Sequence, residues 1–305
     1  MKDKTQTTER VDALLAKMSI EEKVAQLNQI GGADWNNGPK PEEVIRKSGA
    51  GSVLWLNDTK RFNELQKIAV EESPSGIPIL FALDVIHGYR TIFPVPLGMA
   101  ASWDPNVAEK AQTVAAKEAR AAGIHWTFGP MLDIARDARW GRIVEGAGED
   151  PNLGSAMAAA QVRGFQGADE IDTEHVLACA KHFAGYGAAD GGRDYDPVFL
   201  SEAQLRNVYF PPFKAAVDAG VGTFMSAYMD LNNVPASGNR WLLKDVLRDE
   251  WGFEGFVISD AFGVANLAVQ GFAKDRKDAT LRSLQAGQHM DMASSAYLEN
   301  LAELV

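Results

Sequence analysis

Cysteine is almost absent from this sequence of 305 residues, which contains only Cys179. A single cysteine excludes an internal disulfide and a cysteine-based zinc site, so we expect Cys179 to be a small buried apolar residue. The histidines, at positions 87, 125, 175, 182 and 289, include no pair with the spacing of zinc ligands. We therefore expect neither a metal site nor a cofactor.

Positive charge and long apolar runs are also scarce. The chain has 30 Lys and Arg against 41 Asp and Glu, a net charge of −11, and no run rich in Lys or Arg. Because an acidic surface repels nucleic acid and anionic membranes, we expect neither as a partner. No apolar run reaches the roughly 18 residues of a transmembrane helix, and no signal peptide is recognisable. A periplasmic or secreted location, with a leader removed, and a cytoplasmic location both stay open.

Helix and strand patterns alternate along the whole chain. Apolar strand patterns occupy residues 50–57, 77–84, 124–130, 175–183, 222–228 and 255–260. They are continuously apolar, as in parallel sheets that helices cover on both faces, and GAGED (146–150) is too incomplete for a dinucleotide-binding loop. The pattern predicts an α/β fold, a TIM-type (β/α)8 or near-complete barrel. We expect it to fill residues 1–305 as a single domain, with an N-terminal helical lead-in at about 8–30.

Polar side chains follow the predicted strands. They are Asn57, Asp84, Asp133, Lys181, His182, Tyr228, Asp260 and Asp291. In a barrel, the carboxyl ends of the strands meet at one face, so these groups should gather there. Lys181 and His182 are neighbours, and both can reach one ligand only where their strand ends. Carboxylates and cations, with the indoles of Trp55, Trp126 and Trp140, suit a ligand with many hydroxyl groups.

Six blocks of the sequence resemble glycoside hydrolase family 3, of the bacterial β-glucosidase type. They are MSIEEKVAQL (18–27), FALDVIHG (81–88), RWGRIVEGAGEDP (139–151), KHFAGYGAADGGRDY (181–195), MSAYMDLNNVPA (225–236) and GFVISD (255–260). The resemblance implies the N-terminal barrel domain of that family. It also implies a retaining glycosidase that releases terminal non-reducing β-D-glucosyl residues from β-glucosides or short β-gluco-oligosaccharides.

The resemblance further implies roles for single residues. Asp260 looks like the catalytic nucleophile, which forms a covalent glycosyl–enzyme. Cations nearby should favour the charged form of its carboxyl group. The groups that resemble the family's sugar-binding set are Asp84, Arg142, Lys181, His182 and Tyr228. The supporting residues are Glu145, which braces Arg142, and Met225 and Ser226.

Two departures from the family pattern refine these expectations. Ala261 follows the nucleophile where many members carry Trp, so the aglycone side should be more open. The loop GGRDYD (191–196) lacks the histidine that N-acetylglucosaminidase members use as acid/base. In members of the β-glucosidase type the acid/base is a Glu on a following α/β sandwich domain. The helical pattern that ends at Val305 leads us to expect that this chain lacks that domain, so a second domain or chain would supply the acid/base.

Two alternatives stay open at this point. The barrel could bind sugar or act as a scaffold without turnover. It could also cleave as a β-xylosidase or exo-glucanase, because glucose and xylose differ by one hydroxymethyl group, which carries only about 1–3 kcal/mol of discrimination.

Overall fold

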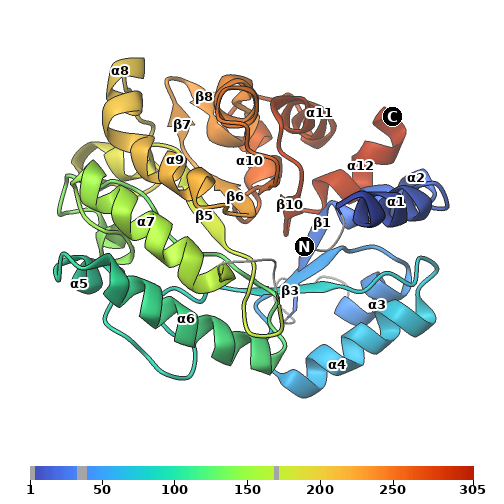
Figure 1. Ribbon diagram of the computed structural model, residues 1–305. Helices are drawn as coiled ribbons and strands as arrows, with labels where there is room; N and C mark the ends of the chain where they lie inside the picture. Colours follow the sequence, from blue (N-terminus) through green and yellow to red (C-terminus); the bar gives the residue numbers. More distant parts are fainter. Residues whose placement is uncertain (1–3, 33–39, 168–171) are drawn as a thin grey trace.

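The computed structural model describes residues 4–32, 40–167 and 172–305, and its parallel strands lie inside a layer of helices (Figure 1). One sheet has five strands, in the order β10 (Asp291–Met292), β1 (Asn28–Gly31), β2 (Ser52–Leu54), β3 (Leu80–Leu83) and β4 (Trp126–Thr127). The other has three, in the order β5 (Cys179–Phe183), β6 (Thr223–Ser226) and β9 (Phe256–Ile258).

The two sheets meet along both edges. Isolated parallel bridges join Trp126 to Leu177 on one side and Ile258 to Met290 on the other. Every pair of neighbours within the two sheets is also parallel. The strands therefore follow one another around a ring, although their pairing is continuous only within each sheet, and the predicted (β/α)8-type barrel is confirmed.

The helices cover the outside of this ring. The longer ones are α3 (Pro41–Arg46), α4 (Thr59–Lys67), α6 (Pro105–Ala122), α7 (Pro151–Gln166), α9 (Pro211–Asp218), η7 (Trp241–Glu250), α10 (Gly263–Val269), α11 (Arg276–Ala286) and α12 (Ala296–Leu304). Shorter segments include α5 (Pro96–Ala100), η2 (Gly141–Glu145), α8 (Glu202–Gln204) and the hairpin of β7 (Asp230–Leu231) and β8 (Val234–Pro235). At the N-terminus lie α1 (Lys4–Leu15) and α2 (Ile20–Gln26), and α2 packs against α12 near the end of the chain (Figure 1).

Sequence signals set several helix boundaries. Ser19 accepts a hydrogen bond from Glu22 N at 3.2 Å, and the Glu22 carboxylate accepts one from Ser19 N at 2.8 Å, so the two residues form a capping box at the start of α2. Asp104 caps α6, whose first residue is Pro105. The helix ends at Gly123, whose φ of 106° favours glycine.

The interior of the barrel is filled by side chains from successive strands. Leu54, Ala82, Trp126, Cys179, Met225, Ile258 and Met292 form one buried cluster together with Phe128 and Met290. Cys179 is fully buried within it and carries a free thiol, as expected from its isolation in the sequence. Because the interior is packed, a ligand can enter only at one end of the barrel.

Sequence patterns did not predict β1, β10 or the β7–β8 hairpin, and the residues of β1 show why. β1 carries Asn28 and Gln29, which are polar yet fully buried. Asn28 Nδ2 donates to Gly49 O at 2.8 Å, and Gln29 Nε2 donates to Ser52 Oγ at 2.9 Å. A search for apolar runs misses such a strand, because the partners of its buried amide nitrogens lie far away in the sequence.

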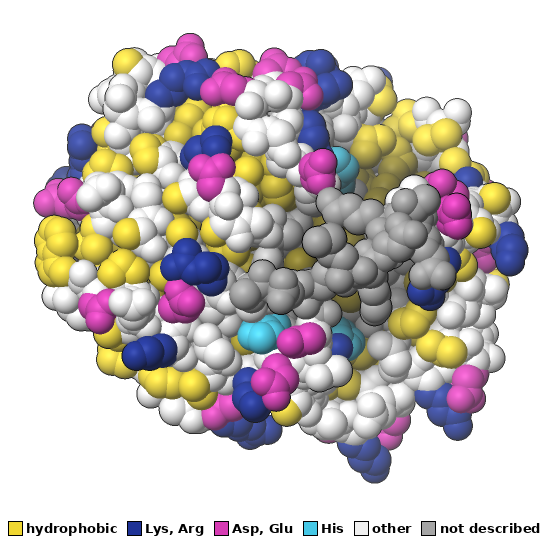
Figure 2. Space-filling model, in the orientation of Figure 1, with side chains coloured by type: hydrophobic (Ala, Val, Ile, Leu, Met, Phe, Trp, Pro, Cys, Tyr) yellow, Lys and Arg dark blue, Asp and Glu magenta, His cyan; other side chains and the backbone are white. Residues whose placement is uncertain are grey.

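Acidic and basic side chains are interspersed on the surface. In Figure 2 they lie next to one another among apolar side chains, rather than in separate areas. Several are ion pairs, such as Arg206 with Glu250 and Arg163 with Glu109, both at 2.7 Å. Within the described residues, no helix is long and apolar enough to cross a membrane.

Candidate active site

A cavity of about 170 Å³ lies where the strands of the barrel end. The residues implied by the family resemblance, namely Asp84, Arg142, Lys181, His182, Tyr228 and Asp260, all line it, together with Met225. They follow or end β3, β4, β5, β6 and β9, so segments distant in the sequence converge at the carboxyl end of the barrel. The cavity is smaller than the ~300–1,000 Å³ usual for drug-sized ligands, and its size suits a single sugar ring.

Asp260 lies directly after β9 and the buried Ser259. Its Oδ1 accepts from Ala261 N at 2.7 Å, and its Oδ2 is 3.5 Å from His182 Nε2. Burial raises the pKa of Asp260 above its usual value, although Lys181, the Ala261 amide and the Tyr228 hydroxyl each lower it. We expected the cations to favour the charged form. The cations do lower the pKa of Asp260, but burial raises it by more.

Lys181 and Asp84 form an ion pair at the side of the cavity. Lys181 Nζ donates to Asp84 Oδ1 at 2.7 Å, and Trp55 Nε1 donates to Oδ2 of the same carboxylate at 3.0 Å. Burial alone would raise the pKa of Asp84, but Lys181 and Trp55 outweigh it and the pKa lies below its usual value. Asp84 is therefore an ionised acceptor, held on both oxygens.

Lys181 and His182 both reach the cavity from the last residues of β5, which ends at Phe183. The register of β5 against β6 shifts between Ala180 and Phe183. An irregular strand of this kind can turn two neighbouring side chains toward one space.

Arg142 is held by Glu145 in η2. The guanidinium donates to both carboxylate oxygens, at 2.7 and 3.0 Å, and lies over the Tyr186 ring at 5.6 Å from its centre. Glu145 therefore braces Arg142, as its spacing in the sequence suggests. It is not itself among the residues that line the cavity.

Other polar groups of the sequence prediction point elsewhere. Ser226 Oγ bonds to Ser237 Oγ at 2.8 Å within the core. Asp291 accepts from Ser294 Oγ at 2.7 Å, and Trp126 Nε1 donates to Thr223 Oγ1 at 2.9 Å. Asn57 pairs with the hydroxyl of Tyr89, and Trp140 with Asp194. A polar residue at a strand end is therefore not by itself evidence of a ligand contact.

Sequence reasoning missed part of the lining and one buried partner. Tyr195, 59% exposed, reaches the cavity from the GGRDYD loop, where its ring lies 5.1 Å from that of Tyr228. Phe128 and Met292 contribute apolar surface. Asp133, one of the polar residues at the strand ends, is the hydrogen-bond partner of His182. The change from an apolar strand to a carboxylate was the signal, but it does not show which side chain the carboxylate meets.

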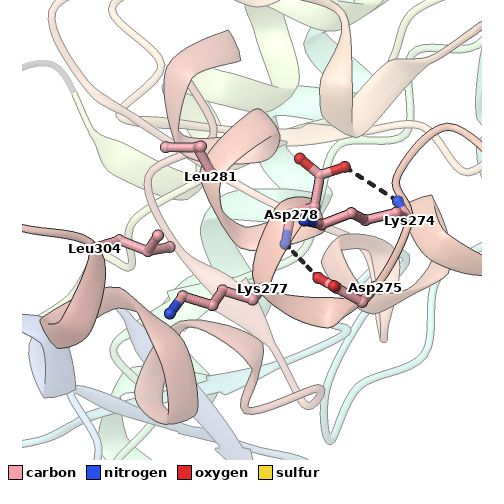
Figure 3. Close-up of a pocket in the computed structure, with 6 residues that line it drawn as sticks. All are labelled: Lys274, Asp275, Lys277, Asp278, Leu281 and Leu304. Atoms are coloured by element: carbon pink, nitrogen blue, oxygen red, sulfur yellow. Dashed lines mark hydrogen bonds between the residues drawn. The ribbon is translucent and has the colours of Figure 1, made fainter.

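A second depression lies between the start of α11 and the end of α12 (Figure 3). Its carboxylates accept hydrogen bonds from backbone amides: Asp278 Oδ2 accepts from Lys274 N at 3.0 Å, and Asp275 Oδ1 accepts from Asp278 N at 2.8 Å. Lys277 pairs with Glu303 at 2.6 Å. Little polar capacity is left for a ligand there. Across the described parts of the chain, no cluster of three His, Cys, Asp or Glu side chains could hold a metal ion.

Comparison with known proteins gives one consistent result. Residues 19–305 match the model of the glycosyl hydrolase family 3 N terminal domain. The chain is 41% identical over 295 residues to a periplasmic beta-glucosidase of Salmonella typhimurium, a match that covers 97% of this chain and 39% of that protein. It is 39% identical over 272 residues to a beta-xylosidase of Formosa agariphila, covering 85% of this chain and 38% of that protein.

Solved structures agree with the sequence relatives. The crystal structure of a beta-glucosidase from Listeria innocua superposes with a TM-score of 0.92 at 38% identity, over 97% of this chain and 43% of that one. The same enzyme has been solved in complex with glucose. The chain thus spans about two fifths of the length of these relatives. Its sequence and its fold place it in glycosyl hydrolase family 3, and it belongs to the N-terminal domain of that family.

Proposed function

We propose that this chain is the nucleophile-bearing part of a retaining β-glucosidase, which removes terminal non-reducing glucosyl residues from β-glucosides or short β-gluco-oligosaccharides. The observation that carries the proposal is the position of Asp260, at the base of a sugar-sized cavity. Asp260 Oδ1 accepts a hydrogen bond from the Ala261 amide, and Oδ2 lies 3.5 Å from His182 Nε2. The Tyr228 hydroxyl donates to the same carboxylate.

The reaction would proceed in two steps. A carboxylate oxygen of Asp260 attacks the anomeric carbon, and the bond from that carbon to the leaving oxygen breaks as the oxygen takes up a proton. Water then attacks the anomeric carbon of the glycosyl–enzyme, loses a proton and releases Asp260. Asp84, Lys181 and Arg142 would hold sugar hydroxyls, since they offer one ionised acceptor and two cationic donors around the same space.

The acid that protonates the leaving oxygen would come from a second domain or chain. Of the described carboxyl groups at this end of the barrel, Asp84 is ionised by its contacts with Lys181 and Trp55. Glu145 is committed to Arg142, and Asp133 lies buried behind His182. Each of these three carboxyl groups therefore already has a partner within the described chain. The exposed Tyr195 supplies a surface for the leaving group or for the domain or chain that would bring the acid.

A slow substrate tests the nucleophile without the acid. A 2-fluoro-glucoside with a dinitrophenolate leaving group needs no proton to depart, so the chain should gain the mass of one fluoroglucosyl group. Peptide mapping should place that group on Asp260. Asp291→Asn is a matched control, because it changes another buried carboxylate, which accepts hydrogen bonds from Ser294 Oγ and from Tyr297 N in α12. Failure of the folded chain to take up the label would refute the proposal.

The need for an external general acid can be tested by varying the leaving group of the substrate. General acids contribute about 10²–10⁴-fold, and leaving groups of low pKa do not need them. The rate of the chain alone should therefore fall steeply as the pKa of the leaving phenol rises. Added azide should increase turnover of the dinitrophenyl substrate, because it attacks the glycosyl–enzyme without a general base. A shallow dependence on leaving-group pKa would mean that the chain carries its own acid.

β-Xylosidase activity is a second candidate, favoured by the 39% identity to a protein of that name. Comparison of kcat/KM for dinitrophenyl β-glucoside and β-xyloside on the same preparation separates the two. We expect glucose to be preferred, and a preference for xylose would reassign the substrate while leaving the role of Asp260 intact.

A further inference from the structure

Asp133 lies directly behind His182. It sits on the segment that follows β4, and its side chain is fully buried. Its Oδ2 accepts two hydrogen bonds from one residue, from His182 N at 3.0 Å and from His182 Nδ1 at 2.8 Å. The segment itself is fixed to β5, since Leu132 N donates to Lys181 O at 2.6 Å. Asp133 is therefore held rigidly against the ring that faces Asp260.

The geometry determines where the ring of His182 carries its proton. Burial, with Arg142 and Lys181 nearby, holds the pKa of His182 well below its usual value, so the ring is neutral and has one N–H. When Asp133 is ionised, its oxygen can only accept, and Nδ1 must be the donor. Nε2 is then an acceptor, 3.5 Å from Asp260 Oδ2.

We propose that Asp133 is a positioning residue for the reaction, which fixes the orientation and the tautomer of His182 so that Nε2 faces the cavity without a proton. The kinetic part of this inference rests on the proposed function. The tautomer itself can be measured without any turnover, so the two can fail separately.

The tautomer matters for both the sugar and the nucleophile. An unprotonated Nε2 can accept a hydrogen bond from a sugar hydroxyl. It cannot donate to Asp260, so the electron density of that carboxylate stays available for attack on the anomeric carbon. In the opposite tautomer, an Nε2–H would bond to Asp260 Oδ2 and weaken it as a nucleophile. The edge of the His182 ring also packs against Tyr186, at 5.1 Å between ring centres, which limits rotation.

Protonation of Asp133 would reverse the arrangement. Burial raises the pKa of Asp133 to about 7. The His182 amide, Arg142 and Lys181 lower it and Glu145 raises it, and these are the charged and polar groups that face it from β5 and η2. A protonated Oδ2 would donate to Nδ1, and the ring proton would move to Nε2. The other oxygen of Asp133 is buried without a hydrogen-bond partner among the described residues, so a proton there would lack the acceptor that His182 Nδ1 offers to Oδ2.

Nitrogen NMR of the folded chain, with its histidines labelled with ¹⁵N, tests the tautomer directly. Only five histidines are present, and His182→Gln identifies the resonances of His182 by their loss. Above pH 8 we expect Nδ1 in the range of a protonated ring nitrogen and Nε2 in that of an unprotonated one. As the pH falls through about 7, the two patterns should exchange. A protonated Nε2 above pH 8 would overturn the proposal.

Two variants of Asp133 separate positioning from folding. Asp133→Asn must keep its carbonyl oxygen toward the His182 amide, so Nδ1 remains the donor and the exchange near pH 7 should disappear. Asp133→Ala removes the anchor, and we expect loss of the single tautomer and a fall in kcat/KM of about 100-fold. Asp291→Asn, a buried carboxylate away from His182, should leave the His182 signals unchanged. If Asp133→Asn titrates as the wild type does, Asp133 does not set the tautomer.

Discussion

The two ends of this barrel solve the problem of buried polar groups in different ways. At the amino end, His125 precedes β4 and His289 precedes β10, and each ring accepts a hydrogen bond from a neighbouring strand. Phe81 N donates to His125 Nδ1 at 3.1 Å, and Val257 N donates to His289 Nδ1 at 3.0 Å. At the carboxyl end the main contacts join side chains to one another, such as Lys181 to Asp84.

This difference explains why only one end is suited to binding. A histidine whose ring accepts a hydrogen bond from a strand amide stabilises the barrel, and that ring nitrogen cannot bind a ligand at the same time. Side chains that bond one another around a cavity can exchange or share their hydrogen bonds with sugar hydroxyls. Burial acts on both ends, since it lowers the pKa of His125 and His289 to about 4 and raises the pKa of Asp260. The following predictions test whether the carboxyl end carries function and the amino end stability.

The largest effect is expected for Asp260→Asn. Loss of the nucleophile should lower the rate of hydrolysis by about 10⁴-fold or more, because a covalent route is removed completely. Stability should change little, since burial already disfavours the charge of this carboxylate. Steady-state kinetics and thermal melts on the same preparation check both parts. A large drop in Tm with residual activity would instead identify Asp260 as structural.

Lys181→Met should come next. It leaves the ionised Asp84 with Trp55 as its remaining donor in the pair, and loss of one partner of a buried charge pair costs about 2–5 kcal/mol. We expect kcat/KM to fall at least about 100-fold, mainly through KM if Asp84 holds a sugar hydroxyl. Trp55→Phe is the milder control, since it removes a neutral donor and should cost about tenfold. Equal effects of the two variants would contradict a special role for the cation.

At the amino end, His125→Ala should affect stability alone. The Phe81 amide would lose its partner, at a cost of about 1–3 kcal/mol in the free energy of unfolding. The cavity is at the opposite end, so kcat/KM of the folded protein should match the wild type. Urea unfolding and substrate kinetics together check this. A kinetic defect as large as that of Lys181→Met would remove the distinction between the two ends.

The same contrast explains how far the sequence alone could go. The barrel was predictable because apolar strands alternate with capped helices, and boundaries such as Ser19 and Gly123 are set by local chemistry. β1 was not, because its buried Asn28 and Gln29 look like surface residues until their distant partners are known.

The candidate site divides in the same way. Residues in family motifs, such as Asp84 and Asp260, could be placed at one cavity from the order of the strands. Two features needed coordinates. Asp133 bonds to a residue 49 positions away, and Tyr195 reaches the cavity from a loop whose path no periodicity encodes. Sequence also could not show that burial outweighs the cations at Asp260, because that balance depends on depth.

The smallest expected effect concerns pH and has opposite signs at the two ends. The pKa of His125 is about 4 in the folded chain and about 6.5 when unfolded, so its contribution to stability is lost as the pH falls below about 6.5. Asp133, with a pKa of about 7 against about 3.9 unfolded, contributes stability at low pH that is lost as the pH rises through 7. When the pH is lowered from 7 to 4.5, the Tm of His125→Asn should therefore fall by about 2 °C less than that of the wild type. The Tm of Asp133→Asn should fall by about 2 °C more than that of the wild type. Melting curves at several pH values provide the measurement, and deviations of the same sign in both variants would show that the two ends do not titrate as their burial requires.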